Sequence, residues 1–303
     1  MNANVFKRGS TAIVIGSNYY RGYMGVQPNM LVKVLKRNER HDEFKYLEIV
    51  RSVENYKKYY SIPENICYLV KPSQRFYNYL KDITREYRMT IFHGDIECYY
   101  INYAGNKDLQ ETIVDMINGV NNRTWRKYSD ILKMAKKILT ALSYLHDKKI
   151  CHLDVKSENI VMNTKTRDFK LIDFGFASME PFDEYVFKPN GTPGYFPKQF
   201  DFDEPTAWFP KIEAFDGNRI YGHYQMVSNR NLVYKIDSYC FGRTLYFLRY
   251  IFEDKIPLSC FDTCTAKNAT KLDKIIILLL ENDPKKRILQ KYCLESCFLS
   301  VNI

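Results

Sequence analysis

Four polar residues in one short stretch carry the chemistry that this sequence offers: Asp154, Lys156, Asn159 and Asp173, all within residues 151–178. The oxygens of Asn159 and Asp173 are ligands of the kind that Mg²⁺ prefers. Asp154 could accept the proton of an attacking alcohol, and Lys156 could neutralise charge on a phosphoryl group in transfer. A loop whose aspartates only form turns would not explain why all four occur together. The stretch therefore indicates metal-assisted phosphoryl transfer.

The spacing of these residues resembles the catalytic loop and metal-binding triplet of eukaryotic-type Ser/Thr protein kinases. His152, Asp154, Lys156 and Asn159 follow the pattern HxDxKxxN, and Asp173-Phe-Gly begins fourteen residues after Asn159. The resemblance implies catalytic roles for Asp154 and Lys156, metal binding by Asn159 and Asp173, and ATP and Mg²⁺ as cofactors. Later segments resemble family landmarks in the family's order: 191–196 (GTPGYF), 237–242 (DSYCFG) and 283–287 (DPKKR).

The nucleotide-binding part is less regular. The run 30–35 (MLVKVL) resembles the strand whose lysine, here Lys33, pairs with the α- and β-phosphates. Segment 6–14 (FKRGSTAIV) best fits the Gly-rich loop, which places Gly9 and Val14 at the cofactor. The rival segment 22–26 (GYMGV) lies too close to Lys33 for a strand pair and a turn.

Two positions in this Gly-rich segment depart from the family pattern. Lys7 and Ala12 stand where the family has its first and third glycines. A methyl group at Ala12 occupies space that a closely approaching phosphate needs. We therefore expect a looser phosphate cradle and weaker ATP binding.

The acidic partner of Lys33 should come from the following helix. Glu48, fifteen residues after Lys33, is the preferred candidate, and Glu43 and Glu54 are the alternatives. With Glu48 as the partner, the position one helical turn later is Ser52, where the family has an apolar residue.

A further segment resembles the hinge that holds the adenine. In this register Ile101 gates the pocket behind the base, and Asn102 and Tyr103 belong to the hinge. Asp108 would meet the ribose. Leu31 stands where the family usually has alanine above the adenine, so the roof of the pocket is expected to be crowded.

Other departures affect regulation and substrate choice. Leu153 replaces the arginine that commonly binds a phosphate on the activation segment. Lys156 indicates Ser/Thr rather than Tyr specificity. Glu158 and Asp108 are placed to favour basic residues in a protein substrate, and the insertion at 200–236 lies beside the expected docking region.

The alternative function is a pseudokinase that acts as a binding scaffold.

The elements predicted around these residues match a two-lobed α+β fold. Apolar runs at 11–15, 30–35 and 98–103 predict strands, and a helix is predicted over 43–59. Apolar residues at helical spacing predict helices over 130–147, 232–251 and 271–281. We therefore expect a β-rich nucleotide-binding lobe at 1–105 and a larger, mainly helical catalytic lobe at 106–303.

Composition limits the class of protein. The 303 residues carry 45 Lys+Arg against 35 Asp+Glu, a net charge of +10 that favours acidic partners without requiring nucleic acid. No apolar run is long enough for a membrane span, and the first residues lack a signal-peptide core, so an intracellular, cytoplasmic or nuclear protein is expected. Eight cysteines leave a zinc site open, although reduced, buried thiols fit better. The compact size and irregular motifs are similar to those of kinases from large DNA viruses.

Overall fold

The computed structural model describes somewhat more than half of the chain. Its described residues are 5–8, 12–16, 30–35, 43–62, 74, 78, 81, 97–102, 105, 107–118, 128–179, 195, 197, 211–216, 219–223, 231–253 and 271–298. The chain forms two compact units. The first contains Met1–Leu47 and Ser61–Ala104, and the second contains Glu48–Tyr60 and Gly105–Ile303. The sequence-based division instead assigned all of residues 1–105 to one lobe.

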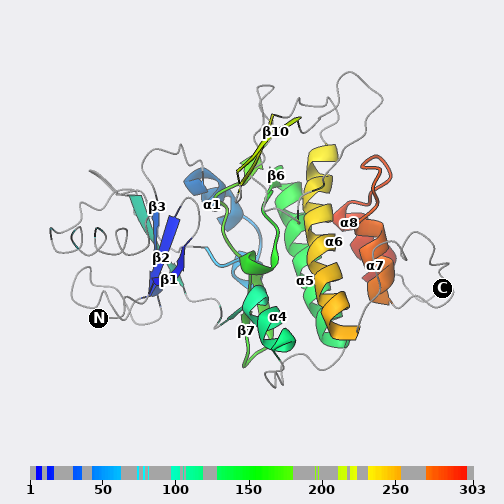
Figure 1. Ribbon diagram of the computed structural model, residues 1–303, viewed down its shortest axis with the longest axis horizontal. Coiled ribbons are helices and arrows are strands. Elements are labelled where there is room, and N and C mark those ends of the chain that lie inside the picture. The colour runs from blue at the N-terminus through cyan, green and yellow to red at the C-terminus, as the bar shows by residue number, and fades with distance from the viewer. Residues whose placement is uncertain are drawn as a thin grey trace. The chain divides into compact units, whose positions relative to one another are not determined.

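The first unit is built on an antiparallel sheet of four strands in the order β1-β2-β3-β4 (Figure 1). The strands are β1 (Val5–Arg8), β2 (Ala12–Gly16), β3 (Met30–Leu35) and β4 (Glu97–Asn102). Val14 of β2 lies opposite Lys33 of β3, and Leu31 of β3 lies opposite Ile101 of β4. Directly opposed residues share one face of a sheet, so the register puts Val14 and Lys33 on the same face.

The single helix predicted over 43–59 is wrong, because the structure divides it. Helix α1 (Glu43–Arg51) ends before a turn, and the short helix α2 (Tyr56–Tyr59) follows. Asn55 precedes α2 with φ of 56°, a left-handed conformation that no continuous right-handed helix can contain. From Glu48 to Tyr60 the chain belongs to the second unit. There Tyr60 donates a 2.5 Å hydrogen bond from its hydroxyl to the carbonyl of Ala141.

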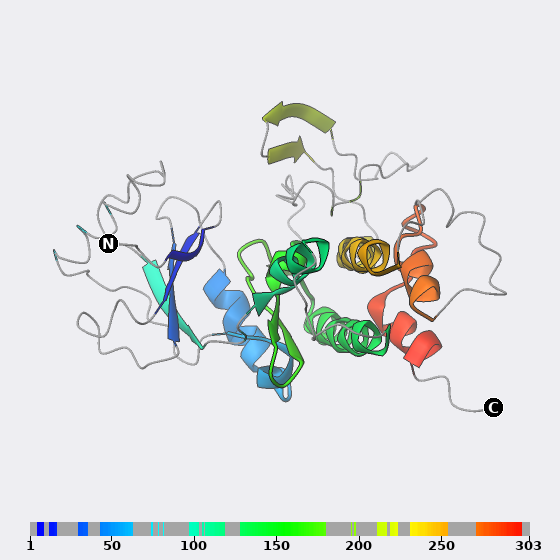
Figure 2. The same ribbon diagram turned by 60° about the horizontal axis from the view of Figure 1, so that its bottom comes forward.

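The core of the second unit is a pair of long helices, α5 (Tyr128–Asp147) and α6 (Asn231–Glu253) (Figure 1). Both carry fully buried apolar residues at helical spacing, among them Ile138 and Leu142 on α5 and Leu245 on α6. Helices α7 (Lys271–Leu279) and α8 (Gln290–Phe298) pack beside them (Figure 2). None of the described helices combines the length and apolar character needed to cross a membrane.

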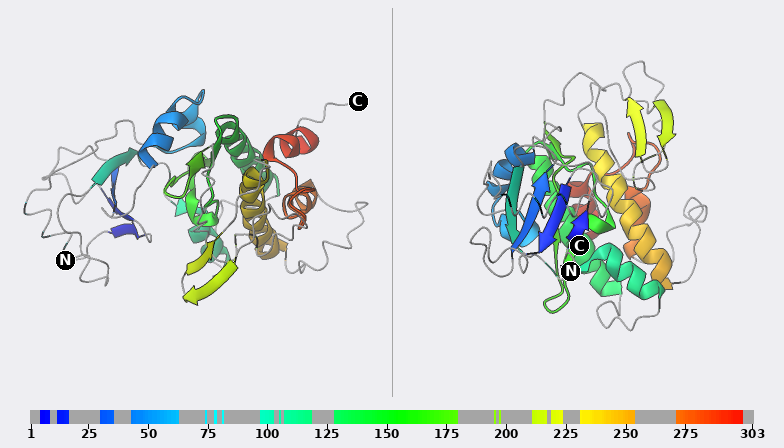
Figure 3. Two further views of the ribbon diagram at one scale, coloured as in Figure 1. Left: turned by 90° about the horizontal axis from the view of Figure 1, so that it is seen from above. Right: turned by 60° about the vertical axis from the view of Figure 1, so that its left-hand side comes forward.

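Short strands flank the loop at residues 152–159, which holds three of the predicted site residues. Strand β6 (Ile150–Cys151) precedes it and pairs with β9 (Ser178–Met179). Strands β7 (Ile160–Asn163) and β8 (Asp168–Leu171) follow it, and β5 (Lys107–Asp108) pairs with β7 ahead of α4 (Leu109–Ile117). Within the long insertion, β10 (Lys211–Asp216) and β11 (Arg219–His223) form a hairpin (Figure 3).

Gly105 marks a close approach of two chain segments within the second unit. A Cβ atom at this position would overlap the backbone carbonyl of Met162 on β7. Any other residue would push β7, and the loop that precedes it, out of place. The glycine therefore keeps the chain near the start of α4 against the strand that follows the catalytic loop.

Candidate active site

Asp154 lies at the centre of a buried hydrogen-bonded group in the loop between β6 and β7. Its side chain is 2% exposed. Its Oδ2 atom lies 2.9 Å from Lys156 Nζ and accepts a 2.8 Å hydrogen bond from Asn159 Nδ2. Asn159 Nδ2 also donates to the backbone carbonyl of Asp154 at 2.8 Å. The three residues predicted to act together are thus in direct contact.

The environment of Asp154 suits a proton acceptor. Burial raises the pKa of its carboxyl, Lys156 opposes that rise, and the nearby negative charge of Asp173 adds to it. A carboxylate with a raised pKa binds a proton more readily than an ordinary aspartate does. Asp154 therefore combines a fixed position with increased basicity.

Asn159 and Asp173 offer oxygen atoms for a metal ion. Because Asn159 Nδ2 donates to Asp154, the side-chain oxygen of Asn159 is the atom left to face a ligand. Asp173 has φ of 65° and accepts a 3.2 Å hydrogen bond at Oδ1 from the backbone N–H of Gly175. An amide oxygen and a carboxylate close to a second carboxylate form a donor set that fits Mg²⁺.

Phe174, next to Asp173, is packed between two aromatic side chains of the same unit. It is 1% exposed, and its ring centroid lies 6.0 Å from that of Tyr60 and 5.1 Å from that of His152. Non-glycine residues hold left-handed backbone angles only where the surroundings impose them, and this packing supplies that constraint for Asp173. Sequence reasoning missed Tyr60, because the residues before it were assigned to one long helix.

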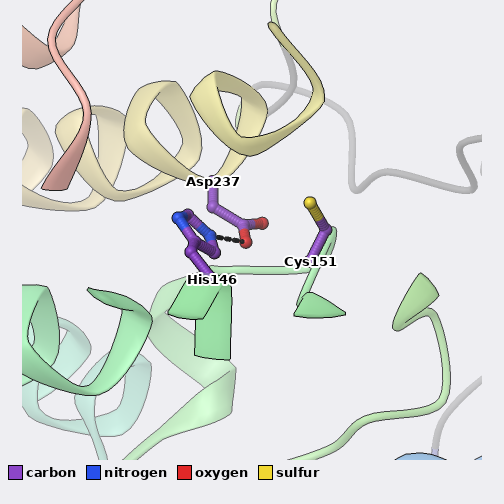
Figure 4. Close-up of side chains that lie close together, drawn as sticks. All are labelled: His146, Cys151 and Asp237. Carbon is purple, nitrogen blue, oxygen red and sulfur yellow. Dashed lines mark hydrogen bonds and ion pairs between the residues drawn. The ribbon is translucent and has the colours of Figure 1, made fainter. Parts of the chain in front are cut away.

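Asp237 anchors the catalytic loop from α6. Its Oδ1 accepts a 2.7 Å hydrogen bond from the backbone N–H of Leu153, and its Oδ2 accepts one of 2.8 Å from that of His152. Oδ2 also lies 2.9 Å from His146 Nε2 on α5 (Figure 4). Leu153 has φ of 62°, a strained conformation for a branched side chain, and the anchored amides hold it there.

The same carboxylate lies near a thiol, which raises the question of a second metal site. His146, Cys151 and Asp237 each offer a ligand atom, and these atoms lie within 4.8 Å of one another (Figure 4). Both oxygens of Asp237 already accept hydrogen bonds from the loop, so the carboxylate has a structural role that requires no metal ion. The cluster is therefore better explained as the anchor of the loop.

Replacing Asp237 with asparagine is expected to lower the free energy of unfolding by about 3 kcal/mol, because the new amide nitrogen faces a buried backbone N–H. Urea denaturation measures this difference. Asp147→Asn removes the same charge from an exposed position on α5 and should change stability little. Equal stability of the two variants would contradict the anchoring role.

In the first unit, Lys33 is paired with Glu43 and not with Glu48, so the preferred partner was wrong. Lys33 Nζ lies 2.7 Å from Glu43 Oε1 and 3.0 Å from Oε2, and both residues are almost fully buried. Glu48 is exposed on α1. Leu47 lies one helical turn after Glu43 and is 2% exposed. With Glu43 as the partner of Lys33, the buried apolar residue that the family has at this position is therefore present, whereas Glu48 would have placed Ser52 there.

A family model confirms what this geometry suggests. The model of the protein kinase domain matches residues 33–200, more than half of the chain. This chain belongs to the protein kinase family. The resemblance noted in the sequence is therefore confirmed, and so is the kinase fold.

The relatives of this kinase include Ser/Thr kinases and viral proteins. A probable myosin light chain kinase of Dictyostelium discoideum is 26% identical over 211 residues, 65% of this chain and 37% of that protein. A putative serine/threonine-protein kinase of Acanthamoeba polyphaga mimivirus is 27% identical over 165 residues, 52% of each. The chain thus covers only 37% and 52% of the lengths of these two relatives.

The kinase PK-1 of Cydia pomonella granulovirus matches in structure with a TM-score of 0.55. The match covers 97% of this chain and 92% of that one, at 14% sequence identity. At that identity the match shows the fold alone. Similar mixed architecture over nearly the whole chain agrees with the predicted α+β class.

Several residues predicted to contact a nucleotide lie on strands of the first unit. Val14 lies on β2 beside Lys33, while Ile101 and Asn102 are the last residues of β4. Gly9 and Tyr103 lie outside the described residues. Strands β1 and β2 pair antiparallel on either side of Gly9, as the chosen Gly-rich segment requires.

Asp108 caps a helix, in addition to the contact with the ribose that was predicted for it. Its Oδ1 accepts a 2.7 Å hydrogen bond from the backbone N–H of Glu111, and Glu111 Oε2 accepts a 3.0 Å bond from the N–H of Asp108. This reciprocal pair caps the start of α4. Contact of Asp108 with a ribose stays a prediction.

Proposed function

We propose that this chain is an active Ser/Thr protein kinase that transfers the γ-phosphoryl group of ATP to a protein hydroxyl. The observation that carries the proposal is the contact of Asp154 with both Lys156 and Asn159. A protein that acted only as a scaffold would not need this arrangement. Asp154 is a buried carboxyl with a raised pKa, and it lies beside Lys156 and the amide of Asn159.

The residues divide the work in the following way. Asp154 accepts the proton of the attacking hydroxyl, and Lys156 stabilises negative charge on the transferred group. Lys33, held by Glu43, binds the α- and β-phosphates. Asn159 and Asp173 would hold Mg²⁺, which neutralises phosphate charge when it is bound.

ATP contacts elsewhere follow the predicted register. Gly9 and Val14 belong to the segment over the phosphates, Ile101, Asn102 and Tyr103 would surround the adenine, and Asp108 would meet the ribose. A protein substrate with basic residues before the target hydroxyl is favoured by Glu158. Its Oε2 lies 3.0 Å from Ser157 Oγ, so a carboxylate lies beside the catalytic loop.

A pseudokinase scaffold is the second candidate. It is favoured by Lys7 and Ala12 in the Gly-rich segment and by Leu153, which is 2% exposed and supplies no cation. These departures affect ATP affinity and regulation. They leave the groups that perform the transfer in place.

Incubation with γ-labelled ATP, Mg²⁺ and a basic protein should put label on serine or threonine. Asp173→Asn should reduce incorporation by about a hundredfold or more, because it removes a charged metal ligand. Asp168→Asn is the matched control: it removes a carboxylate that pairs with Lys137 and should leave the rate unchanged. Nucleotide binding without transfer, in wild type and control alike, would contradict the proposal and favour the pseudokinase candidate.

A further inference from the structure

A short contact joins the loop between β6 and β7 to Tyr195, which belongs to the sequence landmark at 191–196. Tyr195 OH lies 2.5 Å from Ser157 Oγ, and the two residues are 38 positions apart in the chain. Ser157 is fully buried and Tyr195 is 9% exposed. Neither residue has a role in the transfer chemistry described above.

The direction of this hydrogen bond follows from protonation. Burial raises the pKa of Tyr195 to about 12, so its hydroxyl keeps its proton and can donate it to Ser157 Oγ. The single hydrogen of Ser157 is then available to Gln110 Oε1 at 2.7 Å or to Glu158 Oε2 at 3.0 Å. One buried hydroxyl therefore links Tyr195, the catalytic loop and α4.

The ring of Tyr195 is held from α6 as well. Its centroid lies 5.5 Å from that of Phe247 in an edge-to-face arrangement. Phe247 is in turn covered by the guanidinium of Arg243, 4.9 Å from its centroid. Tyr195 is thus held both at its ring and at its hydroxyl, as expected of a residue that positions other groups.

We propose that Ser157 and Tyr195 are positioning residues that lock the segment around Tyr195 to the catalytic loop and so govern use of the protein substrate. The inference rests on the proposed kinase function. Ser157 directly follows Lys156, whose Nζ contacts Asp154, so displacement of Ser157 would disturb the groups that meet the attacking hydroxyl. Contacts with the nucleotide are made by other residues.

Kinetics of Tyr195→Phe, Ser157→Ala and the double variant test the proposal. Each single variant should lower kcat/KM for a peptide by about tenfold, the value of one buried hydrogen bond, and should leave KM for ATP within about twofold. The double variant should lose no more than the worse single variant, because both changes remove the same contact. The proposal would be overturned if the losses in kcat/KM of the two single variants added in the double variant. It would also be overturned if KM for ATP rose by as large a factor as kcat/KM for the peptide fell.

Tyr144→Phe is the matched control. Tyr144 is 38% exposed on α5, where its ring packs edge-to-face with that of Tyr59, 5.2 Å between centroids. Loss of this hydroxyl should leave both kinetic constants unchanged. An effect as large as that of Tyr195→Phe would show that the loss is a general consequence of removing a tyrosine hydroxyl.

Hydrogen exchange separates this inference from the proposed function. Amide exchange near residue 195 should rise about tenfold in Tyr195→Phe and in Ser157→Ala but not in Tyr144→Phe. Unchanged exchange would refute the lock even if the wild type is active. If the wild type transfers no phosphate, the proposed function fails and the substrate role fails with it, while increased exchange would still establish the lock.

Discussion

Asp154→Asn is expected to lower the rate of phosphoryl transfer by about a thousandfold while raising the melting temperature of the protein. Asn cannot accept the proton of the attacking hydroxyl. It can still accept the hydrogen bonds of Lys156 and Asn159, because both reach the same oxygen of Asp154, Oδ2. The variant thus removes the proton acceptor and keeps an oxygen that can accept both of these hydrogen bonds.

The gain in stability follows from the pKa of Asp154. Burial raises that pKa above its value in the unfolded chain, so the folded protein binds the proton more tightly. The corresponding stability is present at low pH and is lost as pH rises through the folded-state pKa. At neutral pH the folded wild type carries a buried charge that the variant lacks.

Thermal unfolding at low and at neutral pH, together with initial rates, checks both parts. The difference in melting temperature between Asp154→Asn and wild type should grow as pH rises and vanish at low pH. Wild-type turnover should fall as pH drops through the raised pKa. Full activity in the variant, or a lower melting temperature at neutral pH, would contradict the assignment.

Glu43→Gln is expected to destabilise the protein by about 3 kcal/mol and to lower activity by about a hundredfold. Lys33 is 3% exposed, so removing the charge of Glu43 takes a carboxylate away from a buried ammonium. A displaced Lys33 would bind the phosphates poorly. Lys33→Met should lose a similar amount of activity.

Glu48→Gln provides the control on the same helix. Glu43 and Glu48 are five residues apart, so at about 100° per residue they point about 140° apart around α1. The exposed Glu48 should be replaceable with little effect on stability or rate. Equal losses in Glu43→Gln and Glu48→Gln would mean that the pairing of Lys33 has been assigned to the wrong residue.

The local parts of the site could be predicted from the sequence. Asp154, Lys156 and Asn159 are two and five residues apart, so their contacts form within one loop and the order of residue types reveals them. The long helices α5 and α6 could be predicted as well, since burial on both repeats at helical spacing. The resemblance to the kinase family pointed to the same loop and to the same helical lobe.

Contacts between distant segments depended on the tertiary structure. Spacing could not decide between Glu43 and Glu48, because the choice depends on which face of α1 lies toward Lys33. Asp237 reaches Leu153 across 84 positions, and Tyr195 reaches Ser157 across 38. The sequence by itself therefore determined the family and pointed to the candidate catalytic groups, whose spacing is local. Only packing decided which distant side chains hold them, because a helix can be turned without any change in its pattern.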